Sequence, residues 1–551
     1  MAVSETHQTK PAAAPKSGNA SYPWWKTGVI YQIYVRSFYD TNGDGVGDLP
    51  GVIAKLDYIR DLGVDAIWLS PVVKSANFDW GYDVTDYYSI EPSIGTMEDF
   101  DRLIAGAEER GIKVIFDFIP NHTSTEHPWF QNALTGTHAQ YRDYYIWRSP
   151  KRDGRPPNNW RAADDGGSAW EYHSPTGQFY LHNWWKQQAD LNWRNPEVLE
   201  EFDKIMRFWL DRGVAGFRLD VFNMLIKDAQ FRDNPKSQKG DGPEIRLLHQ
   251  RPLYNTSQPE VHTILKRWRA IVDEYPDKRL LLGETNRVYD ARLLASFYGQ
   301  QDELKLIFNL AFLDSPFEVS LLRDLVEKSE LALTHANWPM WTATNHDKPR
   351  FPSRWAKGDE RKIRCALLTM VTLRGTPVIY YGDELGMADV FVAPWRLKDP
   401  RGRKYWPVDG GRDRSRTPMP WKNQVGAGFT EKGVRPWLPY GELHTRNVDA
   451  ETDQEDSTLH FTRDLIKLRH RLPALQVAAY EAVDSNDSVW AWHRSQAVLV
   501  AINFSNHHHE LRDVSGEIVL GTVRHREGEA VTGLLHLGPW EGVVVEQAAT
   551  T

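Results

Sequence analysis

The strongest constraint on the fold is an alternation that starts near residue 28 and continues through most of the chain. Short runs rich in β-branched and aromatic residues alternate with amphipathic segments of helical length, a pattern typical of βαβ units and a parallel sheet. The runs that read as strands are 28–35, 66–70, 114–119, 216–221, 280–285, 306–312, 341–346 and 377–382. Eight is the number that closes a (β/α)8 barrel. We therefore predict an α/β fold with a TIM barrel at its centre.

Two further segments depart from this pattern. Residues 123–190 are rich in Trp, Asn and Gly, and they are too long for a plain loop, so we predict a small inserted domain after the third strand. From about residue 476 to 551, short alternating strands predict a C-terminal antiparallel β-domain of the sandwich type. The barrel would then comprise 22–122 and 191–475. The polar residues 1–21, rich in Pro, Ala and Ser, are predicted to form a disordered tail.

Charge and hydropathy exclude some classes of partner. A formal net charge of −8 argues against a nucleic-acid partner, which needs a basic face. The chain has no run of about 18 apolar residues, so we expect no membrane association. The N-terminus lacks the apolar core of a secretory signal, so we expect a cytoplasmic protein. We expect it to be a monomer or a small homo-oligomer.

Acidic residues recur where the predicted strands end: Asp117, Asp220, Glu284 and Asp347. In a barrel these ends open on one face, so the four carboxyl groups should converge despite their repulsion and desolvation. Any one of them alone could equally cap a helix. Together they suit glycosidic cleavage, in which one carboxylate attacks or stabilises the sugar and another carboxyl group protonates the leaving oxygen. Arg218 should point to the same side of its strand as Asp220 and keep it ionised.

These segments carry a family resemblance. In order and spacing, four of them resemble the signature segments of the α-amylase superfamily of glycoside hydrolases: DFIPNHT (117–123), GFRLDV (216–221), GET (283–285) and TNHD (344–347). Four more are similar to the α-glucosidase and oligo-1,6-glucosidase branch: GYDVTDYY (81–88), QADLNW (188–193), GTPVIYYGDELGM (375–387) and GRDRSRTPMPW (411–421). The resemblance runs from about residue 22 into the C-terminal domain.

The resemblance implies roles for the acidic residues at the strand ends. Asp220 would be the nucleophile, Glu284 the acid/base and Asp347 the stabiliser of the transition state. Asp117 and Asn121 match residues that hold the sugar-contacting side chains in place without contacting the sugar themselves.

The resemblance also implies a sugar pocket. The positions that match residues contacting the first glucose are Tyr82, which should stack on it, His122, Arg218 and His346. Asp79 and Arg412 match a pair that closes the pocket behind this glucose. Val221 and Lys348 would border the second sugar, where valine in relatives accompanies α-1,6 preference and Lys348 replaces a residue that is commonly neutral.

The activity that follows is that of a retaining, exo-acting α-glucosidase that needs no cofactor for its chemistry. Its expected substrates are short α-glucosides such as maltose, isomaltose and sucrose, cleaved through a covalent glucosyl-enzyme intermediate. Glucosyl transfer and sucrose isomerisation use the same residues and stay open as alternatives. The superfamily also contains non-catalytic barrel partners of transporters, but the intact set of carboxyl groups and the absence of a membrane helix argue against that role.

A separate motif, DTNGDGVGDLPG (40–51), resembles the start of an EF-hand loop. It offers oxygen ligands at alternate positions, from the side chains of Asp40, Asn42, Asp44 and Asp48 and the carbonyl of Val46. Gly51 stands where an EF-hand has its bidentate Glu, so a solvated turn is the alternative. Relatives carry Ca²⁺ or Mg²⁺ at the matching loop, and we therefore expect a structural cation there, outside the chemistry.

Overall fold

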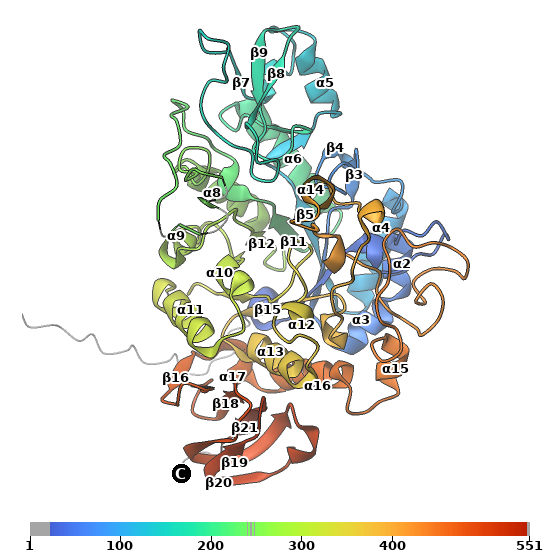
Figure 1. Ribbon diagram of the computed structural model, residues 1–551, viewed down its shortest axis with the longest axis vertical. Coiled ribbons are helices and arrows are strands. Elements are labelled where there is room, and N and C mark those ends of the chain that lie inside the picture. The colour runs from blue at the N-terminus through green and yellow to red at the C-terminus, as the bar shows by residue number, and fades with distance from the viewer. Residues whose placement is uncertain (1–21, 240, 243–244, 247, 335, 548–551) are drawn as a thin grey trace, which may run out of the picture.

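The computed structural model describes residues 22–239, 241–242, 245–246, 248–334 and 336–547, so the predicted disordered tail lies outside the described residues. At its centre eight parallel strands form one sheet, in the order β13-β12-β11-β5-β2-β1-β15-β14 (Figure 1). A parallel bridge between Phe308 and Met340 joins the two edges of this sheet. The predicted barrel is therefore confirmed.

The barrel strands begin near the predicted positions but end earlier. They are β1 (Ile30–Ile33), β2 (Ala66–Leu69), β5 (Lys113–Phe118), β11 (Gly216–Leu219), β12 (Leu280–Gly283), β13 (Leu306–Ile307), β14 (Met340–Trp341) and β15 (Thr376–Tyr380). The prediction of strand over 306–312 is wrong beyond Ile307, because the Asn309 side chain accepts from Phe312 N and starts helix α10 (Leu310–Asp314). The prediction of strand over 341–346 is wrong for a similar reason. Side chains in this segment hydrogen-bond to nearby backbone groups, which therefore do not pair with a neighbouring strand.

Helices surround the barrel: α3 (Leu56–Leu62), α4 (Met97–Glu109), α6 (Pro196–Asp211), α8 (Val261–Asp273), α9 (Ala291–Ser296), α11 (Val319–Ala332), α13 (Glu360–Thr372) and α16 (Thr458–Arg471). Helix α4 shows why they form. Thr96 and Asp99 make a reciprocal capping box at its start. Phe100, Leu103 and Ala107 then repeat at helical spacing and are buried against the barrel. Inside the barrel, a separate core includes Trp68, Ile115, Leu280 and Leu306.

Shorter elements connect these parts. The shorter α-helices are α1 (Trp24–Thr27), α2 (Leu49–Ala54), α5 (Pro128–Leu134), α12 (Phe351–Arg354), α14 (Pro400–Tyr405), α15 (Val448–Thr452) and α17 (Pro473–Val477). Beside the barrel, β3 (Val73–Ser75) and β4 (Val84–Ile90) form an antiparallel pair. The described part of the chain contains no helix long and apolar enough to cross a membrane.

The segment inserted after β5 has its own small sheet. Strands β7 (Trp147–Arg148), β9 (Gln178–Leu181) and β8 (Trp170–His173) pair in that order. The segment leaves the barrel through β6 (His122–Ser124) and returns through β10 (Gln188–Asp190), which pair with each other. This ladder fixes His122 at the mouth of the barrel.

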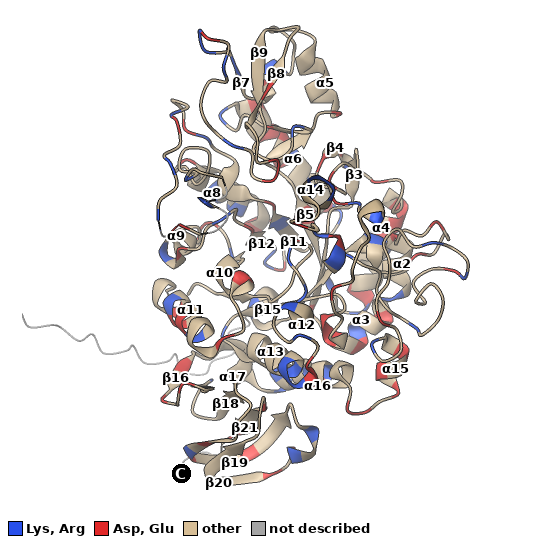
Figure 2. Cartoon of the chain, in the orientation of Figure 1, with Lys and Arg blue, Asp and Glu red and all other residues tan. Residues whose placement is uncertain are grey.

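The C-terminal strands form a single antiparallel sheet at the opposite end of the molecule from the inserted segment (Figure 1). They are β16 (Glu481–Val483), β17 (Val489–His493), β18 (Val498–Asn503), β19 (His509–Gly521), β20 (Ala530–Leu537) and β21 (Gly542–Glu546). Apolar side chains of β17 to β21 make a core of their own. Outer helices such as α11 carry both signs of charge, including the i,i+4 pair of Asp324 and Lys328 (Figure 2).

Candidate active site

Three of the four carboxyl groups predicted at the strand ends contact one arginine. Arg218 projects from β11 and is fully buried. One of its terminal nitrogens donates to Asp117 Oδ1 and to Asp220 Oδ1, at 2.8 Å each, and the other donates to Glu284 Oε2. Asp220 and Glu284 directly follow the adjacent strands β11 and β12. Because a guanidinium is a rigid plane, this contact fixes how far apart the two carboxyl groups lie.

Burial sets the protonation of these two groups apart. It raises the pKa of Glu284 to about 8, although Arg218 opposes the shift. It raises the pKa of Asp220 only to about 6, again against the attraction of Arg218. Near neutral pH, Asp220 is therefore an anion and Glu284 holds its proton. Glycosidic cleavage requires such a pair, with one carboxyl group ionised and the other protonated.

The activity should consequently show a bell-shaped pH profile. Below about pH 6, protonation removes the anionic form of Asp220, and above about pH 8, Glu284 loses the proton that it must donate. We expect kcat/KM to fall on both sides of this window. The measurement is kcat/KM from pH 4.5 to 9.5 on a disaccharide. Full activity at pH 4.5 would contradict the assignment of Asp220.

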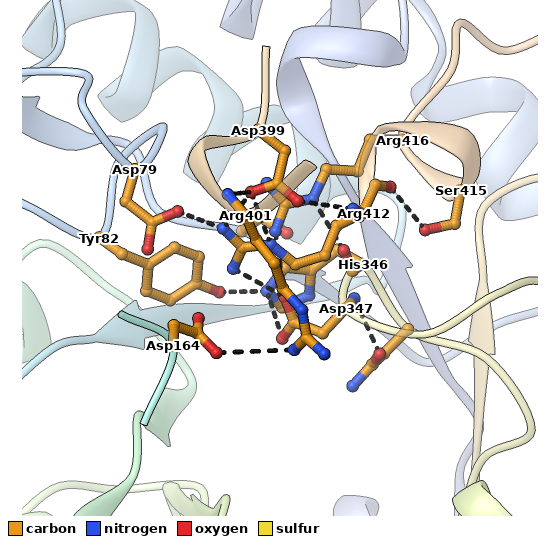
Figure 3. A network of polar contacts seen from close by, with 12 residues as sticks. Asp79, Tyr82, Asp164, His346, Asp347, Asp399, Arg401, Arg412, Ser415 and Arg416 are labelled. Carbon is orange, nitrogen blue, oxygen red and sulfur yellow. Dashed lines mark hydrogen bonds and ion pairs between the residues drawn. The ribbon is translucent and has the colours of Figure 1, made fainter. Parts of the chain in front are cut away.

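Asp347 is held as an anion by two arginines from a different loop and by the adjacent His346 (Figure 3). Arg416 and Arg412 donate to its Oδ1 at 3.0 and 3.3 Å, and His346 Nε2 lies 3.3 Å from its Oδ2. Burial alone would raise the pKa of Asp347, but these three neighbours more than offset it and bring the pKa below its usual value. Asp347 can therefore accept hydrogen bonds from sugar hydroxyl groups without taking up a proton.

A charged wall forms part of the pocket lining. The Arg412 guanidinium contacts Asp79 and also Asp399 Oδ1, the latter at 2.8 Å (Figure 3). Beside this wall, Arg401 from α14 pairs with Asp164 of the inserted segment at 3.5 Å. The pocket that remains has a volume of about 340 Å³. Its lining includes Asp220, Glu284 and Asp347 as well as the wall residues Asp79 and Arg412.

Tyr82 lines the pocket and stacks on a histidine that is buried behind it. The ring of Tyr82 lies parallel to that of His346, with centroids 5.4 Å apart. The Tyr82 hydroxyl donates to Asp117 Oδ2 at 3.1 Å and lies 2.5 Å from His346 Nε2. His346 and Arg218, both expected to contact the first glucose, are fully buried and lie behind the residues that line the pocket. Tyr82 lines the pocket directly.

His122 also lines the pocket, and the residue before it holds its ring. His122 Nε2 lies 2.9 Å from the Tyr82 carbonyl oxygen, and the Asn121 side chain lies 3.2 Å from His122 Nδ1. Asn121 accepts from Lys227 Nζ at 3.0 Å. Asn121 therefore links the His122 ring to the buried Lys227.

Val221 occupies an unexpected backbone conformation. The sequence suggested strand geometry through this residue, but β11 ends at Leu219 and Val221 has φ +36° and ψ +41°. This left-handed conformation is rare for a β-branched residue and costs about 1–3 kcal/mol. It turns the chain sharply after Asp220, and Val221 lines the pocket. The prediction of strand over 216–221 is therefore wrong beyond Leu219, while Val221 still lies at the pocket, where it was expected.

Several residues of the site escaped the sequence analysis: Asp164, Asp399, Arg401 and Arg416. The first three come from segments with no recognised spacing, so nothing in the sequence pointed to them. Arg416 had a signal, because it follows Arg412 in the run RDRSR. Both guanidinium groups contact Asp347.

The candidate metal loop folds as a series of side-chain-capped turns. Asp40 Oδ2 accepts from Gly45 N at 2.8 Å, and Asp44 Oδ1 accepts from Val46 N at 2.8 Å. Asp48 caps helix α2 through Gly51 N. Within the described residues, no group of three or more His, Cys, Asp or Glu side chains is placed to hold a metal ion. A cation here would depend on further oxygen donors, which the Asn42 side chain and the Val46 carbonyl could supply.

A barrel whose strand ends bring together a proton-donating carboxyl group and two carboxylates defines the class of glycoside-cleaving enzymes. Comparison with known proteins identifies the family, since residues 32–478 match the model of the α-amylase catalytic domain. The chain belongs to the α-amylase family and is a glycoside hydrolase.

The relatives are similar in sequence to this chain along nearly their whole length. A probable alpha-glucosidase of Rhizobium meliloti (strain 1021) is 38% identical, over 88% of this chain and 90% of its own. An oligo-1,6-glucosidase of Parageobacillus thermoglucosidasius is 37% identical, with the same coverage. The crystal structure of an alpha-glucosyl transfer enzyme superposes with a TM-score of 0.89 at 38% identity, covering 96% of this chain and all of that one. The crystal structure of a trehalulose synthase variant superposes with a TM-score of 0.87 at 33% identity, covering 95% of this chain and all of that one.

Proposed function

We propose that this protein is a retaining, exo-acting α-glucosidase that releases glucose from the ends of short α-glucosides. The observation that carries the proposal is the pair of carboxyl groups on Arg218, one anionic and one protonated near neutral pH, in a pocket that the ion pair of Arg412 and Asp79 also lines. Relatives named alpha-glucosidase and oligo-1,6-glucosidase support it.

The proposed reaction proceeds by two displacements. Asp220 attacks the anomeric carbon while Glu284 gives its proton to the leaving oxygen, and a glucosyl ester on Asp220 results. The Glu284 carboxylate then takes a proton from water, whose oxygen attacks the same carbon and releases glucose with retained configuration. Asp347 stays ionised throughout and holds hydroxyl groups of the distorted ring. No cofactor takes part.

Glucosyl transfer and sucrose isomerisation are the second candidate function, because an acceptor hydroxyl can replace water in the second displacement. Similar solved structures include the alpha-glucosyl transfer enzyme and the trehalulose synthase. The acceptor site, and not Asp220 or Glu284, would decide between water and a sugar.

Product analysis by NMR tests the proposal on maltose, isomaltose, sucrose and trehalose. We expect α-glucose as the first product and little activity on starch, because in this proposal the contacting pair of Asp79 and Arg412 closes the pocket behind a single glucose. Internal cleavage of an end-blocked maltoheptaoside would overturn exo action. Conversion of sucrose mainly into isomeric disaccharides would favour the second candidate.

Linkage preference should depend on Val221. Its stiff, branched side chain offers no hydroxyl group and narrows the space beside the nucleophile, which favours the more flexible α-1,6 bond. Val221→Thr keeps the branching and hence the backbone strain, so it isolates the hydroxyl group. We expect kcat/KM for isomaltose relative to maltose to fall several-fold, within the roughly 1–3 kcal/mol that one such contact supplies. An unchanged ratio would assign linkage preference elsewhere.

We also propose a structural Ca²⁺ or Mg²⁺ in the loop of residues 40–48. The donors are all oxygens, as hard cations prefer, and Gly45 is at φ +87° where a Cβ would lie 2.3 Å from the Arg435 carbonyl. Exhaustive chelation should lower the Tm by about 2–5 °C, because a ligand of the folded state stabilises it by mass action. Activity at 25 °C should barely change. Asp44→Asn is the control, and a chelator effect of the same size in that variant would contradict the site.

A further inference from the structure

A second pocket lies where the inserted segment meets the loops beside it, and none of its lining residues also lines the pocket that contains Asp220. Its volume is about 300 Å³, at the lower end of the range for small-molecule sites. The charged residues of its lining are three arginines and one carboxylate: Arg142, Arg148, Arg194 and Asp143. The lining therefore carries an excess of positive charge, which favours an anionic ligand.

Two of these arginines have no carboxylate partner. The Arg142 guanidinium is held by neutral groups, since it donates to the Ala133 carbonyl oxygen at 2.7 Å and to the Gln178 side-chain oxygen at 2.6 Å. The Arg148 guanidinium lies over the ring of Phe231, 3.9 Å from its centroid. Within the described residues, neither arginine forms an ion pair. Burial lowers the pKa of Arg142 to about 10, so it still carries its charge near neutral pH.

The third arginine brings another positive charge towards Arg148. Arg194 donates to the Lys227 carbonyl oxygen at 2.6 Å and forms an exposed ion pair with Glu260 at 2.8 Å. Burial and then the charge of Arg194 lower the pKa of Arg148, so the two guanidinium groups repel each other despite Glu260. This repulsion costs free energy in the folded chain, and an anion bound to both groups would offset it.

We propose that this pocket binds a phosphate group, either as the free ion or on a small organic phosphate. A guanidinium presents its N–H groups as a planar fork that matches two phosphate oxygens, and Arg148 and Arg194 offer two such forks on one lining. Stacking restricts the guanidinium planes before the ligand arrives, with Arg148 on Phe231 and Arg142 on Trp147. Such preorganisation reduces the entropy that binding costs. The site does not depend on the activity proposed above.

Titration calorimetry on the full chain tests the site, with inorganic phosphate and glycerol 3-phosphate as the probes. Chloride balances the ionic strength, so that screening by salt stays constant through each titration. We expect saturable binding, and Arg148→Gln should weaken it about tenfold or more through the loss of charge-assisted hydrogen bonds. Tighter binding of glycerol 3-phosphate would identify an organic phosphate as the ligand, and equal binding would identify the free ion. Arg194→Gln repeats the test if Arg148→Gln does not fold.

Matched variants distinguish this pocket from the net charge of the protein. Arg155→Gln removes the same charge from an exposed pair with Asp153 in the same inserted segment, and the Kd should stay within about twofold of wild type. Asp143→Asn removes the one carboxylate of the described lining and should tighten phosphate binding about two- to fivefold. The inference is overturned if neither probe shows saturable binding, if Arg148→Gln binds like wild type, or if Asp143→Asn binds more weakly.

Discussion

Asp220→Asn should abolish turnover while leaving the fold intact. Asn is nearly isosteric with Asp, but its amide cannot form the glucosyl ester on which the double displacement depends. We expect kcat to fall by at least about 10⁴-fold, as for other enzymes that lose a nucleophile. Burial raises the pKa of Asp220, which means that its charge is held at a cost in the folded state. The Tm of the variant should therefore equal or exceed that of the wild type.

A small external nucleophile gives this prediction a stereochemical control. In Asp220→Ala, azide can enter the space of the missing carboxylate and attack the anomeric carbon in one step. A single displacement inverts the configuration, so an α-glucoside should yield β-glucosyl azide. Turnover of Asp220→Asn near the wild-type rate, or α-glucosyl azide from Asp220→Ala, would assign the nucleophile to another residue.

The sequence could predict the parts of the site that depend on regular structure. Asp117, Arg218 and Asp220 lie on or directly after parallel strands, whose carboxyl ends must meet in a barrel. Their convergence follows from the pattern alone. The roles within that cluster came from the family resemblance, because spacing does not say which carboxyl group is protonated. That distinction depends on burial and on the position of Arg218, which only the folded chain provides.

The parts that escaped prediction depend on irregular backbone. Val221 departs from strand geometry one residue after the nucleophile, and periodicity cannot anticipate a left-handed β-branched residue. Asp399 and Arg401 lie at the start of the short helix α14, and the site residues that they contact, Arg412 and Asp164, are more than ten residues away along the chain. Such contacts between loops have no period in the sequence. Strands β13 and β14 are shorter than predicted for the same reason. Hydrogen bonds between side chains and the local backbone take the place of the hydrogen bonds between strands.

Glu284→Gln should separate the two tasks of the acid/base residue. Gln cannot donate a proton to the leaving oxygen, so kcat/KM on maltose should fall by about 10²–10⁴-fold. An aryl glucoside such as 4-nitrophenyl α-glucoside leaves without a proton, so formation of the glucosyl ester on it should stay close to wild type. Water attack on the ester would then be slow, because the base is missing, and an initial burst of nitrophenol should appear.

Two further observations should accompany that burst if Glu284 is the acid/base. Azide needs no general base, so it should accelerate the second step and, after two inversions, yield α-glucosyl azide, the anomer opposite to that from Asp220→Ala. The high-pH limb near pH 8, which reports the proton on Glu284, should vanish from the aryl-glucoside profile. The low-pH limb near pH 6 should persist, because Asp220 is unchanged. A variant equally inactive on both substrates, or one that keeps its high-pH limb, would show that another group donates the proton.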